Sequence, residues 1–443
     1  MMHSARPITP ELIDSFRKGY EEDRTARVLT ATASRTELSE IAYDSAAAAR
    51  LTNAFSVEVK TTGITNQRKS GRCWLFASMN LMREQVIRRC ELDSFELSGN
   101  YFAFWDKLEK INFFLESILD CTALPVGDRT LDWILDSLGD GGQWDMMVSL
   151  VKKYGVVPKS AMPETAQSEG TAELMRYLRT ALRRDAVELR RLAAAGGDTA
   201  ARKDEMLSAY FKALCVAFGE PVQRFDFEYR DKKGDFHADR GLTPQSFYEK
   251  YVGIDLGDYV SVINAPTQDK PFYKTYTVKY LGNVVGGSIR YLNLPMDELK
   301  ALAIRQLQDG ELVWFGSDVG KFGDRKAGIW DTASFRFGEV LGGLRLDMTK
   351  EDRLDYRDSA MNHAMVICGV NLDDEGRPNR WKIENSWGED AGQKGYYVAS
   401  DAWFDEYTYQ VIIHKKYLKA DWLEALAQPP IELEPWDPMG TLA

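Results

Sequence analysis

The pattern of apolar residues changes near residue 257, and this change limits the folds that the chain can adopt. Before that point, apolar residues recur at helical spacing, as in the run 74–89. After it, β-branched and aromatic runs are broken by glycine and asparagine, a pattern typical of strands. Because helices and strands are segregated along the chain and do not alternate regularly, the sequence predicts an α+β fold.

The strand-like runs of the second half are short, and one helix interrupts them. This helix is predicted over 296–307, because Pro295 can start it and Gly310 can stop it. The predicted strands cover residues 273–280, 312–315, 363–370, 381–384, 396–399 and 409–414.

We expect four parts along the chain. The first is a helical leader that wraps the core, with Thr9 as a helix cap and Pro10 at the first helical position. The last is a proline-containing stretch that reads as a stiff, extended arm rather than a helix. The predicted parts are the leader 1–55, a mainly helical lobe 56–256 with a helical hairpin inserted around 168–220, a mainly β lobe 257–420 and the arm 421–443.

Charge and cysteine usage exclude several classes of protein. The net charge of −11 disfavours a general nucleic-acid-binding protein. Five widely spaced cysteines without a C-x-x-C pair argue against a disulfide framework and against a zinc site. The N-terminus has no secretory apolar region, and no window approaches the roughly 20 apolar residues of a membrane span. We therefore expect a soluble cytoplasmic protein with no metal, no cofactor and no membrane partner.

Cys73 lies where a turn of small residues meets a helix-like apolar run, within the stretch 67–78. A cysteine attacks only as its thiolate, and the free N–H groups of a first helical turn stabilise that charge. An isolated cysteine beside aromatic residues is also typical of an ordinary core position. The rest of the sequence has to supply the partners of a nucleophile.

His363 is the candidate base, because it opens the apolar strand 364–370. The other histidines fall at a terminus (His3), in a polar loop (His237) and at a surface position after a strand (His414). A histidine in this place is either a satisfied core residue or a catalytic base.

Two further side chains complete a catalytic set with Cys73 and His363. Asn385 ends a second strand, and two adjacent strands can place its amide oxygen beside the imidazole, with Trp387 as a shield. Gln67, six residues before Cys73, can donate to a developing oxyanion, although a loop glutamine is usually only polar surface.

Together these residues resemble the active site of a papain-like cysteine peptidase. The chain departs from the usual pattern in two ways. It reads Ser70-Gly71-Arg72-Cys73-Trp74 where the family usually has Cys-Gly-Ser/Ala-Cys-Trp, and 290 residues separate Cys73 from His363, about twice the papain spacing.

A closer resemblance, covering nearly the whole chain, is to the bleomycin hydrolase and bacterial aminopeptidase C family. It is carried by the segments 101–109, 140–146, 361–365 and 436–443. The resemblance implies a papain-like fold with helical insertions, and a homohexameric barrel whose active sites face an interior cavity. It also implies that the C-terminal arm of each chain enters its own cleft.

The resemblance implies a thiol aminopeptidase that acts on peptides with a free N-terminus through an acyl-enzyme, and that also hydrolyses bleomycin-like amides. Cys73 and His363 would form a thiolate–imidazolium pair, giving a bell-shaped dependence of kcat/KM on pH.

Four residues are candidates for substrate binding. Gly141 and Gly142 would pair with the substrate backbone, with an ordinary helix-breaking turn as the alternative, and Gln143 would line a pocket. The α-carboxylate of Ala443 would pair with the substrate ammonium, with a disordered tail as the alternative.

Two other functions stay open at this point. One is an endopeptidase or acyl transferase that uses the same residues in an open cleft. The other is a non-catalytic, nucleic-acid-binding scaffold, which the net charge of −11 and the complete set of catalytic residues oppose.

Overall fold

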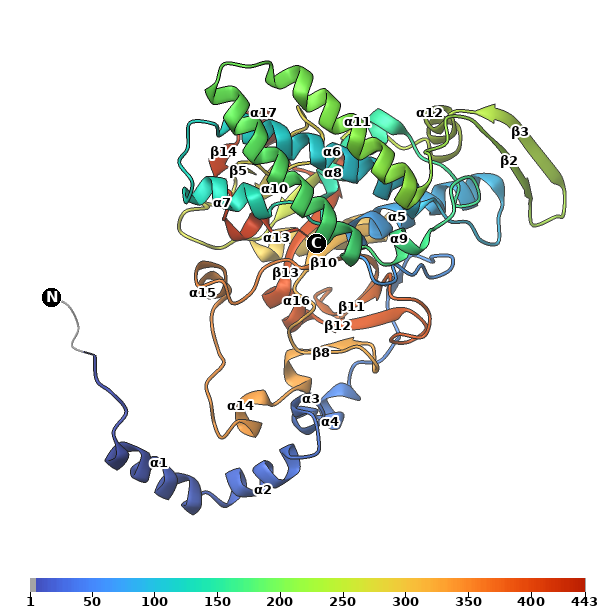
Figure 1. Cartoon of the computed structure of the whole chain (residues 1–443). Helices are drawn as coiled ribbons and strands as arrows, with labels where there is room; N and C mark the ends of the chain where they lie inside the picture. The colour runs from blue at the N-terminus through green and yellow to red at the C-terminus, as the bar shows by residue number, and fades with distance from the viewer. Residues whose placement is uncertain (1–4, 443) are drawn as a thin grey trace.

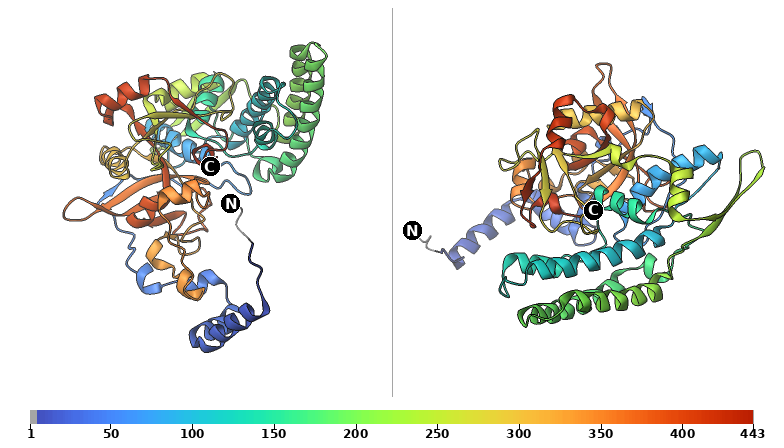
Figure 2. Two further views of the ribbon diagram at one scale, coloured as in Figure 1. Left: turned by 90° about the vertical axis from the view of Figure 1, so that its left-hand side faces the viewer. Right: turned by 90° about the horizontal axis from the view of Figure 1, so that it is seen from above.

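The computed structural model describes residues 5–442 (Figure 1). Its helices and strands form two connected regions, a mainly helical first half and a second half that supplies most of the sheet. Helices of the first half cover one side of a large sheet formed mostly by the second half (Figure 2). The α+β fold predicted from the segregated patterns is confirmed. Within the described residues no helix has the length and apolar character that crossing a membrane requires.

The central helix is α5 (Cys73–Cys90), which is buried on nearly all its sides. It packs against the sheet on one side and against other helices on the other. The remaining helices of this half are α6 (Gly99–Asp120), α7 (Arg129–Asp136), α8 (Trp144–Tyr154), α9 (Ala166–Glu169), α10 (Ala172–Ala194) and α11 (Thr199–Phe218). The last two form the inserted hairpin at the predicted place.

The sheet has the strand order β14-β5-β6-β4-β13-β7-β10-β11-β12-β9-β8, with β1 paired to β10. Its strands are β1 (Val57–Glu58), β4 (Tyr259–Ile263), β5 (Thr275–Val278), β6 (Tyr291–Asn293), β7 (Val313–Ser317), β8 (Gly323–Asp324), β9 (Ile329–Trp330), β10 (His363–Leu372), β11 (Pro378–Glu384), β12 (Tyr396–Ser400), β13 (Thr408–His414) and β14 (Ile431–Leu433). All six predicted strands are present. The other six strands of the sheet, β1, β4, β6, β8, β9 and β14, were not predicted.

Strand β10 positions the functional region of the sheet. It pairs antiparallel with β7 on one side and with β11 on the other, and α5 packs against it. The N-terminal end of α5, the start of β10 and the end of β11 therefore meet.

The remaining helices, apart from those near the two ends of the chain, are α12 (Pro244–Phe247), α13 (Met296–Gln308), α14 (Phe337–Val340), α15 (Lys350–Asp355) and α16 (Asp401–Tyr407).

A two-stranded hairpin, β2 (Phe225–Arg230) and β3 (Phe236–Leu242), extends from the helical half. The sequence places His237 in a polar loop, and this is wrong, because the residue lies in β3. Its ring stacks on Tyr229 with centroids 4.8 Å apart, and its Nε2 atom is 2.9 Å from Oδ2 of Asp231. The dense charges of the hairpin concealed its alternating pattern.

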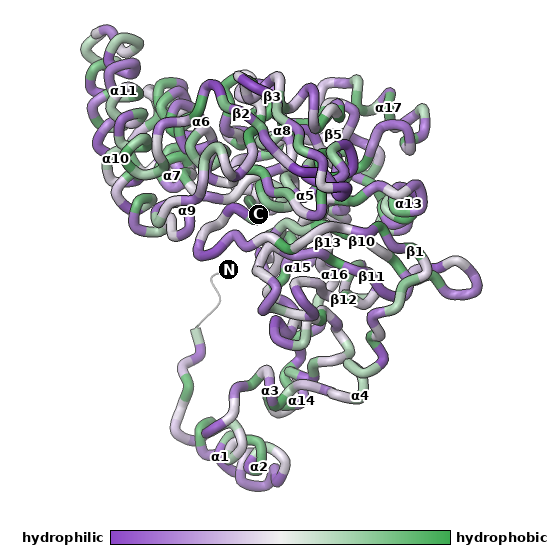
Figure 3. The backbone as a smooth tube through the Cα atoms, turned by 90° about the vertical axis from the view of Figure 1, so that its right-hand side faces the viewer, coloured by the Kyte–Doolittle hydropathy of each residue, from purple (hydrophilic) through white to green (hydrophobic). Residues whose placement is uncertain are grey.

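The N-terminal leader does not wrap the core as predicted. Helices α1 (Pro10–Glu22) and α2 (Arg24–Ala33) bury no side chain and extend away from the body (Figure 1). Both mix hydrophilic and hydrophobic residues (Figure 3), and the rest of residues 5–442 buries none of their side chains. The predicted start is confirmed, since Thr9 accepts a hydrogen bond from the Leu12 N–H at 3.3 Å. Two short helices, α3 (Leu38–Ala42) and α4 (Ser45–Ala48), lead back to the body.

The C-terminal stretch is only partly extended. It begins with α17 (Ala420–Ala427), which the prediction of an extended arm missed, because five of that helix's eight residues are Ala or Leu and the prolines of the arm lie further on. Strand β14 then pairs in parallel with β5, and a 3₁₀ turn covers Pro438–Gly440, capped by Asp437. These contacts fix the arm along the body.

Candidate active site

Cys73 is the first residue of α5 and is 2% exposed. No side chain caps this helix end, so its free N–H groups face the thiol. The backbone N–H groups of Ala364, Trp74 and Cys73 itself act on the sulfur and lower the pKa of the thiol. Since Ala364 directly follows His363, the sulfur lies against the start of β10.

His363 and Asn385 meet as the sequence predicts. The Nε2 atom of His363 is 2.9 Å from Oδ1 of Asn385, which also accepts the Ser386 N–H at 2.8 Å. Because that oxygen accepts, Nε2 carries the proton and Nδ1 is left with a lone pair. The ring of Trp387 lies 4.8 Å from the imidazole, centroid to centroid, and shields this bond.

Burial favours the neutral forms of both groups. It raises the pKa of Cys73 to about 11, against the effect of the N–H groups, and Asp140 raises it further. It lowers the pKa of His363 to about 4, with a smaller contribution from Arg325, while the bond to Asn385 acts in the opposite direction. Desolvation therefore opposes a thiolate–imidazolium pair in the closed site.

Gln67 is buried and held at both ends of its amide. Its Nε2 atom donates to the carbonyl oxygen of Ser70 at 2.7 Å, and its Oε1 atom accepts from Oγ of Ser386 at 2.7 Å. One N–H of the amide is thus committed, and the second remains for a ligand. The side chain links the loop before Cys73 to the residue after Asn385.

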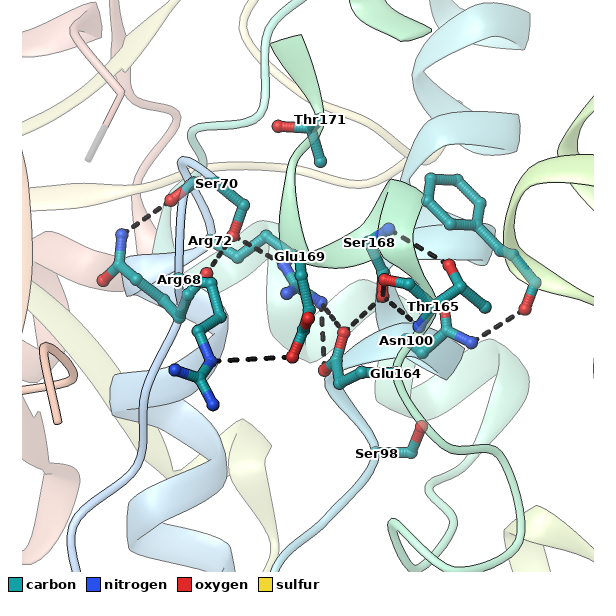
Figure 4. Close-up of polar contacts among 12 residues, drawn as sticks. Arg68, Ser70, Arg72, Ser98, Asn100, Glu164, Thr165, Ser168, Glu169 and Thr171 are labelled. Carbon is teal, nitrogen blue, oxygen red and sulfur yellow. Dashed lines mark hydrogen bonds and ion pairs between the residues drawn. The ribbon is translucent and has the colours of Figure 1, made fainter. Parts of the chain in front are cut away.

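A buried polar network fixes the loop that leads into Cys73 (Figure 4). Arg72, 1% exposed, donates from Nε to Oγ of Ser70 at 2.8 Å and from Nη1 to both carboxylate oxygens of Glu164 at 3.0 and 3.2 Å. Glu164 also accepts from Ser168. Arg68 pairs with Glu169 near the surface at 3.5 Å. The residue before the thiol is therefore tied to the segment before α9.

Gly141 and Gly142 lie in a closely packed loop that leads into α8. A Cβ atom on Gly142 would lie 2.4 Å from the ring of Trp74, so close packing requires glycine there. The Gly141 carbonyl accepts from Nζ of Lys110 at 2.6 Å, and the indole N–H of Trp74 donates to the Asp140 carbonyl at 2.9 Å. Lys110 thus engages the Gly141 carbonyl, whereas no backbone hydrogen bond of Gly142 is formed with the described residues, and the pairing of these glycines with a substrate stays a prediction.

The C-terminal arm reaches this region. Nε2 of Gln143 donates to the carbonyl of Thr441 at 2.6 Å, and Leu442 packs against the apolar cluster that contains Cys73. Beside the arm lies a cavity of about 450 Å³ whose lining includes Lys110, Trp133, Met361, Asn362 and Leu442. Ala443 lies outside the described residues.

Two contacts anchor the base of the arm. Nζ of Lys270, 2% exposed, pairs with the carboxylate of Asp437 at 2.8 Å. The guanidinium carbon of Arg129 lies 3.7 Å from the ring centroid of Trp436. Sequence reasoning missed Lys270 and Arg129 because only the fold brings them to the arm. Within residues 5–442 no three His, Cys, Asp or Glu side chains form a group suited to a metal ion.

The model of the Peptidase C1-like family matches residues 7–440. The chain is 48% identical to Aminopeptidase C of Listeria monocytogenes over 98% of this chain and 99% of that protein, and 52% identical to Aminopeptidase C of Streptococcus thermophilus over 88% of each. It is also similar to the crystal structure of PepW from Lactobacillus rhamnosis HN001, with a TM-score of 0.97, 47% identity and 100% coverage of both chains.

Proposed function

The chain belongs to the Peptidase C1-like family, and on that premise we propose that it is a cysteine aminopeptidase with Cys73 as nucleophile. One observation carries the choice of an aminopeptidase: Thr441 accepts a hydrogen bond from Gln143, and Leu442 packs against the apolar cluster that contains Cys73. An arm in that place leaves room for little of a peptide on the acyl side of the scissile bond. The resemblance to aminopeptidase C predicted from the sequence agrees with the relatives found.

The chemistry begins with a neutral pair. Nδ1 of His363 takes the proton of Cys73 as the sulfur attacks the peptide carbonyl, and Asn385 holds the imidazole in the required tautomer. The free N–H of Gln67 and the N–H of Cys73 stabilise the oxyanion.

The acyl-enzyme then forms and is hydrolysed. The imidazolium of His363 returns its proton to the departing amine, the C–N bond breaks and a thioester to Cys73 remains. Water adds to the thioester with His363 again as base, releasing the carboxylic acid and restoring the thiol. Each step is a proton transfer paired with one bond made and one broken.

The arm supplies the selectivity in this proposal. Residue 443 follows Leu442 directly, so the α-carboxylate of Ala443 is proposed to pair with the ammonium of the substrate's first residue. A carboxylate in a site of low dielectric discriminates strongly between a charged and an acylated N-terminus. The anchors at Lys270 and Arg129 keep the arm in place.

Several finer points follow from the same proposal. Because the acyl-enzyme forms with any amine as leaving group, bleomycin-like amides are included among the substrates. The five free cysteines suit a cytoplasmic location. Self-association as a homohexamer is proposed on the family resemblance, and the exposed apolar side chains Phe16 and Val28 of α1 and α2 suit an interface.

The experiment is a comparison of one peptide with its N-acetylated form. The proposal expects rapid hydrolysis of the free peptide, little of the acetylated form, and none of either by Cys73→Ala. Deletion of Thr441 to Ala443 is expected to allow cleavage of the acetylated peptide. Equal cleavage of both forms by the intact protein would instead identify an endopeptidase or acyl transferase with an open cleft.

A further inference from the structure

Arg325 lies beside the catalytic pair without belonging to it. It stands in the turn between β8 and β9, and its guanidinium carbon is 4.6 Å from the ring centroid of Trp387. The same indole ring lies 4.8 Å from the imidazole of His363. The indole ring of Trp387 therefore contacts both the candidate base, His363, and the guanidinium of Arg325.

The turn holds Arg325 in a defined place. Its carbonyl oxygen accepts the Gly392 N–H at 3.0 Å and the Tyr397 hydroxyl at 3.2 Å. Oδ1 of Asp324 accepts the N–H groups of Lys326 and Ala327 at 2.8 and 2.9 Å, so this carboxylate is engaged by the turn itself. The backbone of Arg325 is thus fixed to the loop that follows Trp387.

The guanidinium is available to a ligand. Arg325 is exposed, and among residues 5–442 no carboxylate lies within salt-bridge distance of it. Other exposed arginines of the chain also lack an acidic partner, and what distinguishes Arg325 is its place on the ring of Trp387 beside His363. Stacking on indole also restricts the side chain, so less conformational entropy is lost when it binds an anion.

The proton transfer by His363 indicates which part of a substrate lies near Arg325. His363 protonates the departing amine, so the leaving fragment begins beside the imidazole. In the proposed function the arm, which contacts Gln143, occupies the acyl side of the scissile bond. The leaving fragment therefore extends from His363 along Trp387 toward Arg325.

We infer that Arg325 binds a carboxylate on the leaving fragment and makes short peptides the preferred substrates. This inference rests on the proposed aminopeptidase function. One residue spans at most about 3.6 Å, so the C-terminal carboxylate of a leaving fragment of one or two residues reaches the far side of an indole ring. An acidic side chain directly after the scissile bond offers the same group at a similar distance.

The test compares substrates that differ only in that carboxylate. Leu-Gly is compared with Leu-Gly amide, and Leu-Glu amide with Leu-Gln amide. An exposed arginine–carboxylate pair is worth about a fivefold preference in kcat/KM, expressed mainly in KM and weakened by added salt. The first pair reports a terminal carboxylate and the second an acidic side chain.

The variants assign the preference to Arg325. In Arg325→Met the ratio of acid to amide is expected to fall to about one, and in Arg325→Lys to an intermediate value. Lys326→Met is the matched control, because it removes the neighbouring cation of the same turn, and its ratio should equal that of the wild type.

The contrary outcomes are distinct from a failure of the proposed function. Equal rates for Leu-Gly and its amide in the wild type, or an undiminished ratio in Arg325→Met, would overturn the role of Arg325 while leaving the aminopeptidase intact. Hydrolysis of neither dipeptide nor amide would overturn the aminopeptidase as well.

Discussion

The Nε2 atom of His363 lies 2.9 Å from Oδ1 of Asn385, and the two residues come from the start of β10 and the end of β11. The antiparallel pairing of these strands creates the contact, with Val366 opposite Glu384. The bond leaves Nδ1 of His363 free to accept the thiol proton. The orientation of the base thus depends on sheet register.

Replacing Asn385 by Ala should therefore reduce kcat more than it changes KM. Loss of one orienting hydrogen bond, worth about 1–2 kcal/mol, predicts a reduction of roughly five- to thirtyfold. Steady-state kinetics on an aminoacyl amide measures it. Asn371→Ala, at an exposed pair near the other end of β10, is the control and should keep wild-type values. A variant that lost only substrate affinity would contradict the orienting role.

Replacing Arg72 by Met should destabilise the whole protein. The change leaves the buried carboxylate of Glu164 without its ion pair, which predicts a loss of about 3–5 kcal/mol in the free energy of unfolding. Arg68→Met breaks the exposed pair with Glu169 nearby and should cost less than about 1 kcal/mol. Denaturant titration of both variants measures the difference. Similar losses would show that burial of the Arg72 pair is unimportant.

Replacing Lys270 by Met should loosen the arm. Asp437 would keep its buried charge without a partner, and relief of that charge favours release of the segment that ends in Leu442. The expected result is cleavage of an N-acetylated peptide at least about tenfold above the wild type, since tenfold corresponds to only 1.4 kcal/mol. Lys274→Met, exposed on the same segment, should show no gain. If Lys270→Met cleaved the N-acetylated peptide no faster than the wild type, the Lys270–Asp437 pair would have no role in selecting a free N-terminus.

Local patterns were sufficient for much of the fold and for the juxtaposed residues of the candidate site. Thr9 and Pro10 predicted the start of α1, and the apolar run after His363 predicted β10. The meeting of His363 and Asn385 followed from two adjacent strands. These features depend on neighbours in sequence or on one strand pairing, which a linear pattern records.

Features that depend on contacts between distant segments could not be predicted. No pattern near Arg72 in the sequence predicts its pairing with Glu164, and none predicts that the ring of Trp74 leaves no room for a Cβ atom at Gly142. The burial that opposes charge on Cys73 and His363 has the same origin. The helix end favours a thiolate, as the sequence predicts, whereas the degree of burial that opposes it exists only in the folded chain.

Lys350 predicts a pH dependence of stability. Its Nζ atom donates to the carbonyls of Asp405 and Thr408, at 2.9 and 2.6 Å, and burial lowers the pKa of this lysine from 10.5 to about 7. Between these pH values the unfolded chain binds a proton that the folded chain does not. The contribution of Lys350 to the free energy of unfolding therefore falls as pH drops from about 10.5 to about 7.

The Lys350→Met variant lacks this titration. Its free energy of unfolding, measured relative to the wild type by urea titration, should improve steadily as pH is lowered across that interval. Lys326→Met, exposed in a turn, should show a difference that does not vary with pH. A constant difference for Lys350→Met would mean that the buried amine keeps its proton.

The pH profile of catalysis should respond to Arg325. Because a neutral imidazole is the base in this mechanism, kcat/KM falls as pH drops through the pKa of His363, which burial and then Arg325 lower to about 4. Removing the guanidinium removes a repulsive positive charge, so Arg325→Met raises the pKa of His363 and moves the acid limb to higher pH.

An aminoacyl amide is the substrate for this measurement, because it has no carboxylate that Arg325 could bind. The profile should stay bell-shaped, since loss of the thiol proton through the high pKa of Cys73 ends activity on the alkaline side. Lys326→Met should leave the acid limb in place. A shift of the limb to lower pH in Arg325→Met would have the wrong sign for a cation acting on His363, and would locate the titrating group elsewhere.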